Sequence, residues 1–341
     1  MRTFLAVVIP SLVLSDRVAA QCAAGTTQEI SGNWYCSEVT AITYANFPGF
    51  GSYEKITDMD VNTGDCSSVR YNYKGSTWSS STTTSTSSSS SSTSTAPASN
   101  GGWARQAYFN AASGTAEGLT FLNHFGAMDG IPGTSAGGPA FGTSLSYASS
   151  DGQSGAASAQ VLSNAMIEDD TEVIIMTDQS CSDGGCGFTR PGGVAYHGFS
   201  GAQKVFLLEF SMPFTNSTTF NGDMPAIWLL NAQIPLTSQY GTNAECSCWT
   251  SGCGEFDLFE VLDSGNFRCK STLHMAPAGG SSDWFQRPTG GSITAAVVIA
   301  GEHEVAAIRV LDGGQSFDAT LSEDVVSGWV NEAGSVFKME G

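Results

Sequence analysis

The sequence predicts an all-β fold whose main domain is a β-sandwich of the jelly-roll type. Three observations support this prediction. After residue 100 the chain carries many short apolar runs rich in Val, Ile, Leu and Phe, separated by turn-forming residues. No long amphipathic helical pattern interrupts these runs. Closely spaced short strands over about 240 residues are typical of a sandwich, not of alternating strands and helices.

The predicted strands are separated by segments that contain residues favouring turns, such as Gly, Pro, Asn, Asp and Ser. Only over Glu302–Leu311 is a helix an alternative to a strand. The expected strands are Gly118–His124, Thr171–Thr177, Lys204–Ser211, Ala226–Leu230, Glu255–Leu262, Ser271–Met275, Ala295–Ala300 and Val305–Leu311.

Composition divides the chain into four parts. Residues 1–20 have the pattern of a secretory signal peptide, because Arg2 precedes an apolar run too short to span a membrane. Residues 21–75 predict a small, cysteine-containing, β-rich module. Residues 76–100 are almost entirely Ser and Thr, which predicts a disordered linker because such a segment cannot bury enough apolar surface. Residues 101–341 form the main domain.

The charge of the chain limits its partners. With 32 Asp and Glu against 13 Lys and Arg, the net charge is −19, which disfavours nucleic acid and anionic membrane surfaces. A neutral polysaccharide is compatible with this charge. No later segment is long and apolar enough to cross a membrane. We therefore expect an exported, monomeric protein with no membrane span.

Export makes disulfide bonds the expected state of the nine cysteines. The later group of six could pair within itself, with Cys181–Cys186 as a short loop, whereas the first group of three leaves one thiol over. That thiol is free, pairs between domains, or pairs with another chain. The cluster Cys246, Cys248 and Cys253 also resembles a zinc site, but with no nearby histidine disulfides are favoured. The first group is Cys22, Cys36 and Cys66, and the second is Cys181, Cys186, Cys246, Cys248, Cys253 and Cys269.

Three carboxylates crowd one predicted strand, at Glu255, Asp257 and Glu260. Side chains at i and i+2 share a face of a strand, so Glu260, at i+5, would face away in a regular strand. A β-bulge between Asp257 and Glu260 would return it to the common face. The glutamate Cα atoms would then lie about 13 Å apart, from four steps of about 3.3 Å. Inward-leaning side chains could bring the carboxyl groups to about 5–5.5 Å, the separation that retaining glycosidases use.

This arrangement suits cleavage of a glycosidic bond. Glu255 would be the nucleophile, Glu260 the acid/base, and Asp257 would keep one glutamate ionised and the other protonated. The alternative is a solvated edge strand with outward charges. It accounts poorly for the apolar Leu258, Phe259, Val261 and Leu262.

Several motifs carry a resemblance to known families. The segment Gly254–Glu260 resembles the bulged E-x-D-x-x-E signature of glycoside hydrolase family 16, the laminarinase-type β-glucanases. Met224–Leu230 and Ser271–His274 resemble the neighbouring strands of that family. The cysteine pattern Cys246–Glu255 is closer still to the fungal "target of SBF" cell-wall proteins. Those proteins also carry an N-terminal module like Gly32–Cys36 and a Ser/Thr-rich stretch.

The resemblance implies a concanavalin-A-like β-jelly roll and β-1,3-glucan as the substrate. It assigns the nucleophile to Glu255, its assistant to Asp257 and the acid/base to Glu260. This chain departs from family 16 in two places. Met224 stands where a tryptophan is usual, and the three-cysteine loop is not general in that family.

Other candidate residues carry less information. Trp228, Trp249 and Trp284 are candidate sugar-stacking platforms, with core packing as the alternative for Trp228. His274 either hydrogen-bonds substrate or a neighbouring carboxylate, or serves packing alone. Asn216 begins an N-glycosylation sequon.

The sequence therefore predicts a secreted enzyme of the fungal cell wall that cleaves internal β-1,3-glucan linkages with retention. The chemistry requires neither a cofactor nor a metal. One alternative is a transglycosylase that uses the same residues. The other is a non-catalytic glucan-binding wall protein.

Overall fold

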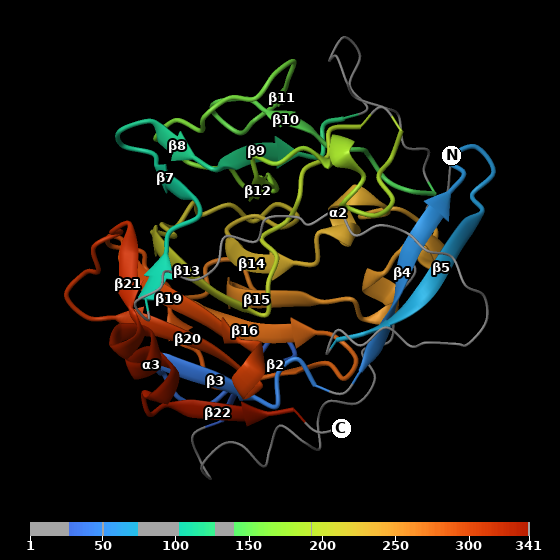
Figure 1. Ribbon diagram of the computed structural model, residues 1–341. Helices are drawn as coiled ribbons and strands as arrows, with labels where there is room; N and C mark the ends of the chain where they lie inside the picture. Colours follow the sequence, from blue (N-terminus) through green and yellow to red (C-terminus); the bar gives the residue numbers. More distant parts are fainter. Residues whose placement is uncertain (1–26, 50, 74–101, 127–139, 192, 340–341) are drawn as a thin grey trace.

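The computed structural model describes residues 27–49, 51–73, 102–126, 140–191 and 193–339. The expected signal peptide lies outside the described residues, and so does the expected linker. Strands dominate the described chain (Figure 1). The all-β prediction is confirmed, and Glu302–Leu311 becomes a short 3-10 turn, η4 (Gly301–His303), followed by a strand.

Two facing sheets build the sandwich. All their pairings are antiparallel except the one between β22 and β3. The five-stranded sheet has the order β13 (Gln203–Phe210), β19 (Ile293–Ala300), β20 (Val305–Leu311), β3 (Ala41–Ala45) and β22 (Ser335–Lys338). The second sheet has the order β14 (Ala226–Leu230), β15 (Glu255–Glu260), β16 (Arg268–His274) and β17 (Gly279–Gly280), with β18 (Phe285–Gln286) also paired to β16.

The main core lies between these two sheets. Tyr44 of β3 meets Phe256 of β15 edge to face, with ring centroids 4.9 Å apart. Val297 and Ile308 of the five-stranded sheet are fully buried in the same cluster as Phe259 of β15. Alternating side chains of two sheets thus fill one interior, as in a jelly-roll sandwich.

The outer face of the five-stranded sheet is covered by α3 (Glu323–Asn331), which packs Val326 and Trp329 against Ala296 and Val298. Ser322 caps this helix: its hydroxyl accepts a hydrogen bond from the backbone N–H of Val325. The short β21 (Thr320–Ser322) precedes it and pairs with β6 (Gly102–Ala104).

A four-stranded sheet lies on the side of β14 and β15 opposite to β3 and β22 (Figure 1). Leu236 of α2 (Gln233–Leu236) packs into its core with Leu122 and Met176. The order of the sheet is β11 (Gly155–Ala156), β10 (Ser146–Ala148), β9 (Leu119–Asn123) and β12 (Ile174–Thr177), and β7 (Tyr108–Asn110) and β8 (Thr115–Glu117) form a hairpin before it.

The N-terminal region differs from the expected separate module, because one of its strands belongs to the main sheet. Composition suggested a separate module before the linker, but β3 lies between β20 and β22 in the main sheet. Composition does not reveal which strands pair across a long sequence separation, and the linker tract looked like a domain boundary. Two hairpins flank β3 in the chain: β1 (Gln28–Ile30) with β2 (Asn33–Tyr35), and β4 (Ser52–Met59) with β5 (Cys66–Asn72).

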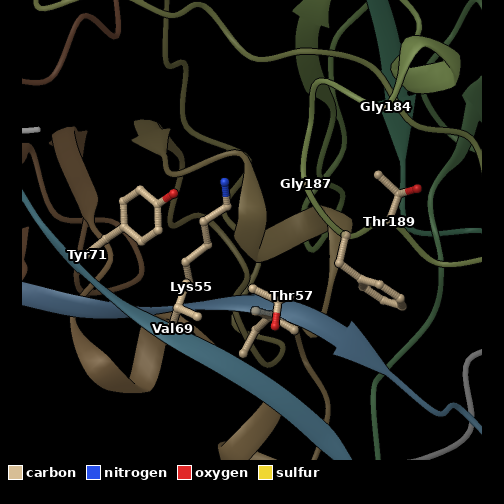
Figure 2. A pocket seen from close by; sticks show the side chains of 9 residues that line it. Lys55, Thr57, Val69, Tyr71, Gly184, Gly187 and Thr189 are labelled. Atoms are coloured by element: carbon tan, nitrogen blue, oxygen red, sulfur yellow. The ribbon is translucent and has the colours of Figure 1, made fainter. Parts of the chain in front are cut away.

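A cavity of about 380 Å³ lies between the β4–β5 hairpin and the segment Gly184–Thr189 (Figure 2). The Lys55 ammonium lies 5.1 Å from the centre of the Tyr71 ring at its wall. Among the described residues, no carboxylate lines this cavity.

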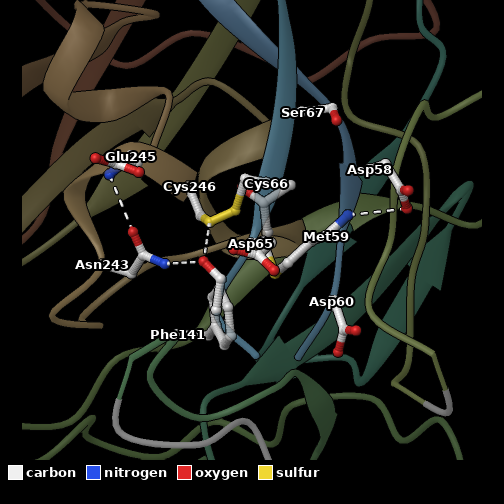
Figure 3. The surroundings of a disulfide bond; sticks show 12 residues. Asp58, Met59, Asp60, Asp65, Cys66, Ser67, Phe141, Asn243, Glu245 and Cys246 are labelled. Carbon is white, nitrogen blue, oxygen red and sulfur yellow. Dashed lines mark hydrogen bonds between the residues drawn. A yellow bond between two sulfur atoms is a disulfide. The ribbon is translucent and has the colours of Figure 1, made fainter. Parts of the chain in front are cut away.

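The disulfides hold the loops to the sheets. Cys181–Cys186 is confirmed, and it closes a loop that contains the 3-10 turn η1 (Cys181–Asp183). The zinc alternative is wrong, because Cys248 pairs with Cys253 and Cys246 pairs with Cys66 (Figure 3).

The later cysteines therefore do not pair only among themselves. Cys246 reaches back to β5 of the N-terminal region, and Cys269 is a buried free thiol. Cys36 is disulfide-bonded. The 3-10 turns η2 (Ala244–Cys246) and η3 (Trp249–Ser251) lie in the cysteine loop before β15.

None of the helices in the described ranges is both long and apolar enough to cross a membrane.

Candidate active site

The predicted bulge is present in β15. Along β16, Asp257 pairs with Thr272 and Glu260 pairs with Lys270. Three steps on β15 therefore match two steps on β16. One residue is absorbed between Asp257 and Glu260, which is the definition of a β-bulge.

The other neighbouring strand locates the extra residue. Asp257 pairs with Trp228 of β14, and Phe259 pairs with Ile227. Leu258 is thus left without a partner on β14, and its side chain is fully buried in the core.

The bulge places the three carboxylates on one face. Trp228 and Ala226 are two apart on β14 and share a face, and they pair with Asp257 and Glu260. Glu255 shares that face because it is two residues from Asp257. Phe256, Leu258 and Phe259 enter the core instead. The prediction of a bulge that returns Glu260 to the face of Glu255 and Asp257 is therefore confirmed.

His274 connects two of the carboxylates. It pairs across the sheet with Glu255. Its Nε2 lies 3.0 Å from Asp257 Oδ2 and 3.7 Å from Glu255 Oε1. The close contact with Asp257 is the main cause that raises the pKa of His274 above its usual value. His274 therefore contacts carboxylates and does more than pack.

Trp249 contacts the nucleophile candidate directly. Its indole Nε1 donates a hydrogen bond of 2.8 Å to Glu255 Oε2. The Cys248–Cys253 disulfide closes the loop that carries it. Its side chain is 44% exposed, so one part of the ring remains open to a ligand.

The two glutamates differ in their electrostatics. Burial, followed by the charge of Asp257, raises the pKa of Glu260 to about 7. Burial and Asp257 also raise the pKa of Glu255, but the charge of His274 and the hydrogen bond from Trp249 act in the opposite direction. Burial of a carboxyl disfavours its charged form, whereas a donor or a nearby positive charge favours that form.

Lys270 does not neutralise Glu260, although the two residues pair across the sheet. Its ammonium instead donates to the backbone carbonyls of Trp34 and Ser281, at 3.0 and 2.6 Å. Burial lowers the pKa of Lys270 to about 8. Nothing in the sequence distinguished this lysine.

The two remaining candidate tryptophans, Trp228 and Trp284, differ in whether a ring face is open to a ligand. Trp228 is half-buried on the carboxylate face, directly across from Asp257, so it stays a candidate platform. The expectation for Trp284 is wrong. It is only 8% exposed, with the Arg268 guanidinium 4.9 Å from the centre of its ring and Phe267 against it edge to face. A sugar has no open face to stack on.

The predicted glycosylation site lies where a glycan could attach. Asn216 is exposed in the loop between β13 and β14.

Three groups near Glu255 were not predicted. Glu172 and Tyr240 lie close enough for electrostatic coupling, because the charge of Glu172 adds to the raised pKa of Glu255, and Glu255 likewise raises the pKa of Tyr240. His124 contacts Glu172, with 3.5 Å between Nε2 and Oε1. They come from three separate segments, so no sequence spacing could have connected them.

One set of side chains has metal-ligating atoms close together. Glu255, Asp257 and His274 offer atoms that all lie within 4.8 Å of one another. A cation there would compete with the contact between His274 and Asp257 for the same atoms.

Comparisons with known proteins cover most of the chain. Residues 101–329 match the family "Cell wall protein YJL171C/Tos1, C-terminal". The chain is 47% identical over 240 residues to "Probable circularly permuted 1,3-beta-glucanase TOS1" of Saccharomyces cerevisiae, covering 70% of this chain and 51% of that protein. A protein of Schizosaccharomyces pombe, also named a "probable circularly permuted 1,3-beta-glucanase", is 45% identical over 246 residues, with coverages of 70% and 47%. The TOS1 protein of Candida albicans is 43% identical over 248 residues, with coverages of 70% and 51%.

The chain spans about half the length of these curated relatives. No solved structure matches it.

Proposed function

Because the chain belongs to the YJL171C/Tos1 family of cell wall proteins, we propose that it is a glycoside hydrolase that cleaves internal β-1,3-glucan linkages with retention of configuration. The relatives' names supply the linkage. Their description as circularly permuted also fits a sheet in which β3, from the N-terminal region, lies between the late strands β20 and β22.

One observation carries the proposal: the bulge puts Glu255, Asp257 and Glu260 on one face, with a different environment for each glutamate. Retaining glycosidases use two carboxyl groups about 5–5.5 Å apart, one as a nucleophile and one as an acid/base. At Glu255 the Trp249 hydrogen bond and the charge of His274 oppose the rise in pKa that burial and Asp257 cause. Glu260 has a pKa of about 7 and keeps its proton over part of the neutral range.

The first step forms a glycosyl-enzyme. A carboxylate oxygen of Glu255 attacks the anomeric carbon while Glu260 gives its proton to the departing glycosidic oxygen. The bond from the anomeric carbon to that oxygen breaks, and the shortened glucan leaves as an alcohol. Glu260 is then ionised.

The second step returns the enzyme to its starting state. Glu260 takes a proton from water, whose oxygen attacks the anomeric carbon and displaces Glu255. Two inversions give net retention. Asp257 supports both steps, because its negative charge raises the pKa of Glu260 and its carboxylate holds His274 beside Glu255.

Location follows from the same family. We infer that the protein acts in the cell wall after export, where the three disulfides between described cysteines would persist. Asn216, exposed in its loop, would carry an N-linked glycan there.

Product analysis tests the proposal. Purified protein is incubated with β-1,3-, β-1,4-, β-1,6- and mixed-linkage glucans, and products are separated by size while NMR follows the anomeric configuration. We expect internal cleavage of the β-1,3-glucan with β-configured first products. Products of α configuration would reject retention, and products longer than the substrate would identify a transglycosylase. Activity equal to that of the Glu255→Gln variant would reject the enzyme.

A further inference from the structure

A second polar cluster lies beside Glu255, on the four-stranded sheet. In the β9–β12 pairing Leu122 is opposite Ile174, so the same register continued outward places His124 opposite Glu172. His124 Nε2 lies 3.5 Å from Glu172 Oε1 and 2.8 Å from the side-chain oxygen of Gln239. The Tyr240 hydroxyl donates to the other oxygen of Glu172.

Tyr240 is held in an unusual position. Its φ of 58° lies in the left-handed region, which bulky residues rarely occupy. The buried Arg190 fixes the preceding turn by donating to the carbonyl oxygens of Thr237, Gly142 and Phe141. Strained conformations persist where the surroundings impose them, and they gather at ligand sites.

The held side chain is nevertheless open to solvent. Tyr240 is 66% exposed, although its hydroxyl is bound. Its ring meets His124 edge to face, with centroids 5.3 Å apart. A rigid aromatic ring that protrudes beside a carboxylate offers an apolar face together with a hydrogen-bond acceptor.

The cluster is close to the proposed nucleophile. The loop that carries Tyr240 leaves β14 at Leu230, the cross-strand partner of Glu255. At its start, the backbone N–H of Asn231 donates to the carbonyl of Gly254, at 2.8 Å. Glu172 and Tyr240 both interact electrostatically with Glu255.

We propose that Tyr240, Glu172 and His124 form a glucosyl subsite that binds the same glucan chain whose bond is attacked at Glu255. The Tyr240 ring stacks on a pyranose face. Glu172 Oε1 is buried and makes no hydrogen bond with any residue in the described part of the chain, so a sugar hydroxyl that displaces the covering side chains finds an unused acceptor there. This subsite rests on the proposed function, since it needs a glucan at Glu255.

Binding measurements test the subsite. Titration calorimetry is done with β-1,3-linked gluco-oligosaccharides of increasing length, in a Glu260→Gln background that prevents turnover. Tyr240→Ala should weaken the affinity for long oligosaccharides about five- to tenfold, within the range of aromatic stacking, and that for the shortest ones less. Tyr240→Trp, which keeps a flat ring, should restore binding. Phe220→Ala is the matched control, because Phe220 is an exposed aromatic that the proposal does not use.

The alternative is a purely structural contact between Tyr240 and Glu172. In that case Tyr240→Ala and Tyr240→Trp would both lower the melting temperature and leave the dissociation constants equal to the parent's, which would overturn the subsite. Weakened binding that Tyr240→Trp fails to restore would overturn it too.

Kinetics separate this inference from the proposed function. In the otherwise unchanged protein, Tyr240→Ala should raise KM on long substrates while kcat stays within about twofold, as for loss of uniform binding. If the unchanged protein cleaves β-1,3-glucan and Tyr240→Ala cleaves and binds identically, only the subsite is wrong. If the unchanged protein neither binds nor cleaves any glucan, both proposals fail.

Discussion

The two ends of β15 present similar carboxyl groups in contrasting surroundings. At one end, Glu255 is contacted by Trp249 and faces His274. At the other end, the cross-strand lysine of Glu260 turns away and donates to backbone carbonyls. Burial and Asp257 therefore raise the pKa of both glutamates, whereas Glu255 also accepts the Trp249 hydrogen bond, which favours its charged form. β15 fixes only where the two glutamates lie. The difference in their surroundings comes from the neighbouring loops and hairpins, such as the loop that carries Trp249.

The largest expected effect comes from exchanging each glutamate separately. Glu260→Gln should lower kcat/KM on β-1,3-glucan about 10²- to 10⁴-fold, the usual contribution of a general acid/base. Much of the rate of the first step should return with an aryl glucoside whose leaving group needs no proton. Glu255→Gln should lose at least as much on glucan and recover nothing.

Glu209→Gln is the matched control, because Glu209 is an exposed glutamate on β13 whose partner is Ser292. Recovery by the Glu255 variant in place of the Glu260 variant would reverse the two roles.

Removing the charge between the glutamates should have the next largest effect. In Asp257→Asn the pKa of Glu260 should fall, because a neutral amide no longer opposes its ionisation. Glu260 must be protonated to act, so the alkaline limb of the kcat/KM profile should move to lower pH. We expect activity at pH 7 to fall roughly tenfold to hundredfold.

A full pH–rate profile measures this change, with Asp60→Asn as a remote control for loss of one charge. An alkaline limb that stays in place would show that Asp257 does not set the acidity of Glu260.

A smaller effect on activity, limited to the Glu255 end of β15, is expected from replacing Trp249. Trp249→Phe keeps a ring but removes the hydrogen bond to Glu255, so the pKa of Glu255 should rise. Because Glu255 must be ionised, the acid limb should move to higher pH, with a loss of roughly tenfold on its acid side. The alkaline limb should not move.

Trp103→Phe is the matched control, since Trp103 makes the same kind of indole–carboxylate bond, to Glu323, in another part of the molecule. If Trp249→Phe shifted the alkaline limb instead, the two ends of the strand would not be independent.

The smallest effect on catalysis should follow from opening the bond between Cys66 and Cys246. These residues are separated by 180 positions, so the double Ser variant should lose about 2–5 kcal/mol of stability. Neither glutamate touches this disulfide, and both limbs of the pH profile should keep their positions at temperatures where the variant stays folded. Chemical denaturation measures the loss, and the short Cys181–Cys186 loop provides the comparison. A displaced limb would mean that this bond also positions the carboxylates.

The sequence predicted those features of the site that depend on residues of one strand or of its neighbouring strand. The i, i+2, i+5 spacing required a bulge, and the structure has it at Leu258. The contacts of His274 with carboxylates could also be anticipated, because a single neighbouring strand supplies it. The burial of Trp284 depends on Arg268 and Phe267 packing around it, which a lone aromatic in the sequence does not reveal.

Long-range features escaped prediction for a different reason. The cluster of His124, Glu172 and Tyr240 joins three segments whose spacing in the chain carries no information about their contact. The same holds for β3, whose partners lie at the other end of the sequence. The Ser/Thr tract marks a break in composition, but strands from before and after it belong to the same sheet.

The place of β3 in the sheet also determines when the sheet can form during translation. Arg309, fully buried, donates a 2.8 Å hydrogen bond to the carbonyl of Ile42, which the ribosome adds 267 residues earlier. The neighbours of β3 on both sides, β20 and β22, are translated long after β3. The native neighbours of β3 are therefore missing until β20 and β22 have been translated, so the five-stranded sheet closes late in the folding of these residues. Cellular quality control would thus meet an apolar early strand whose neighbours in the described sheet are made much later.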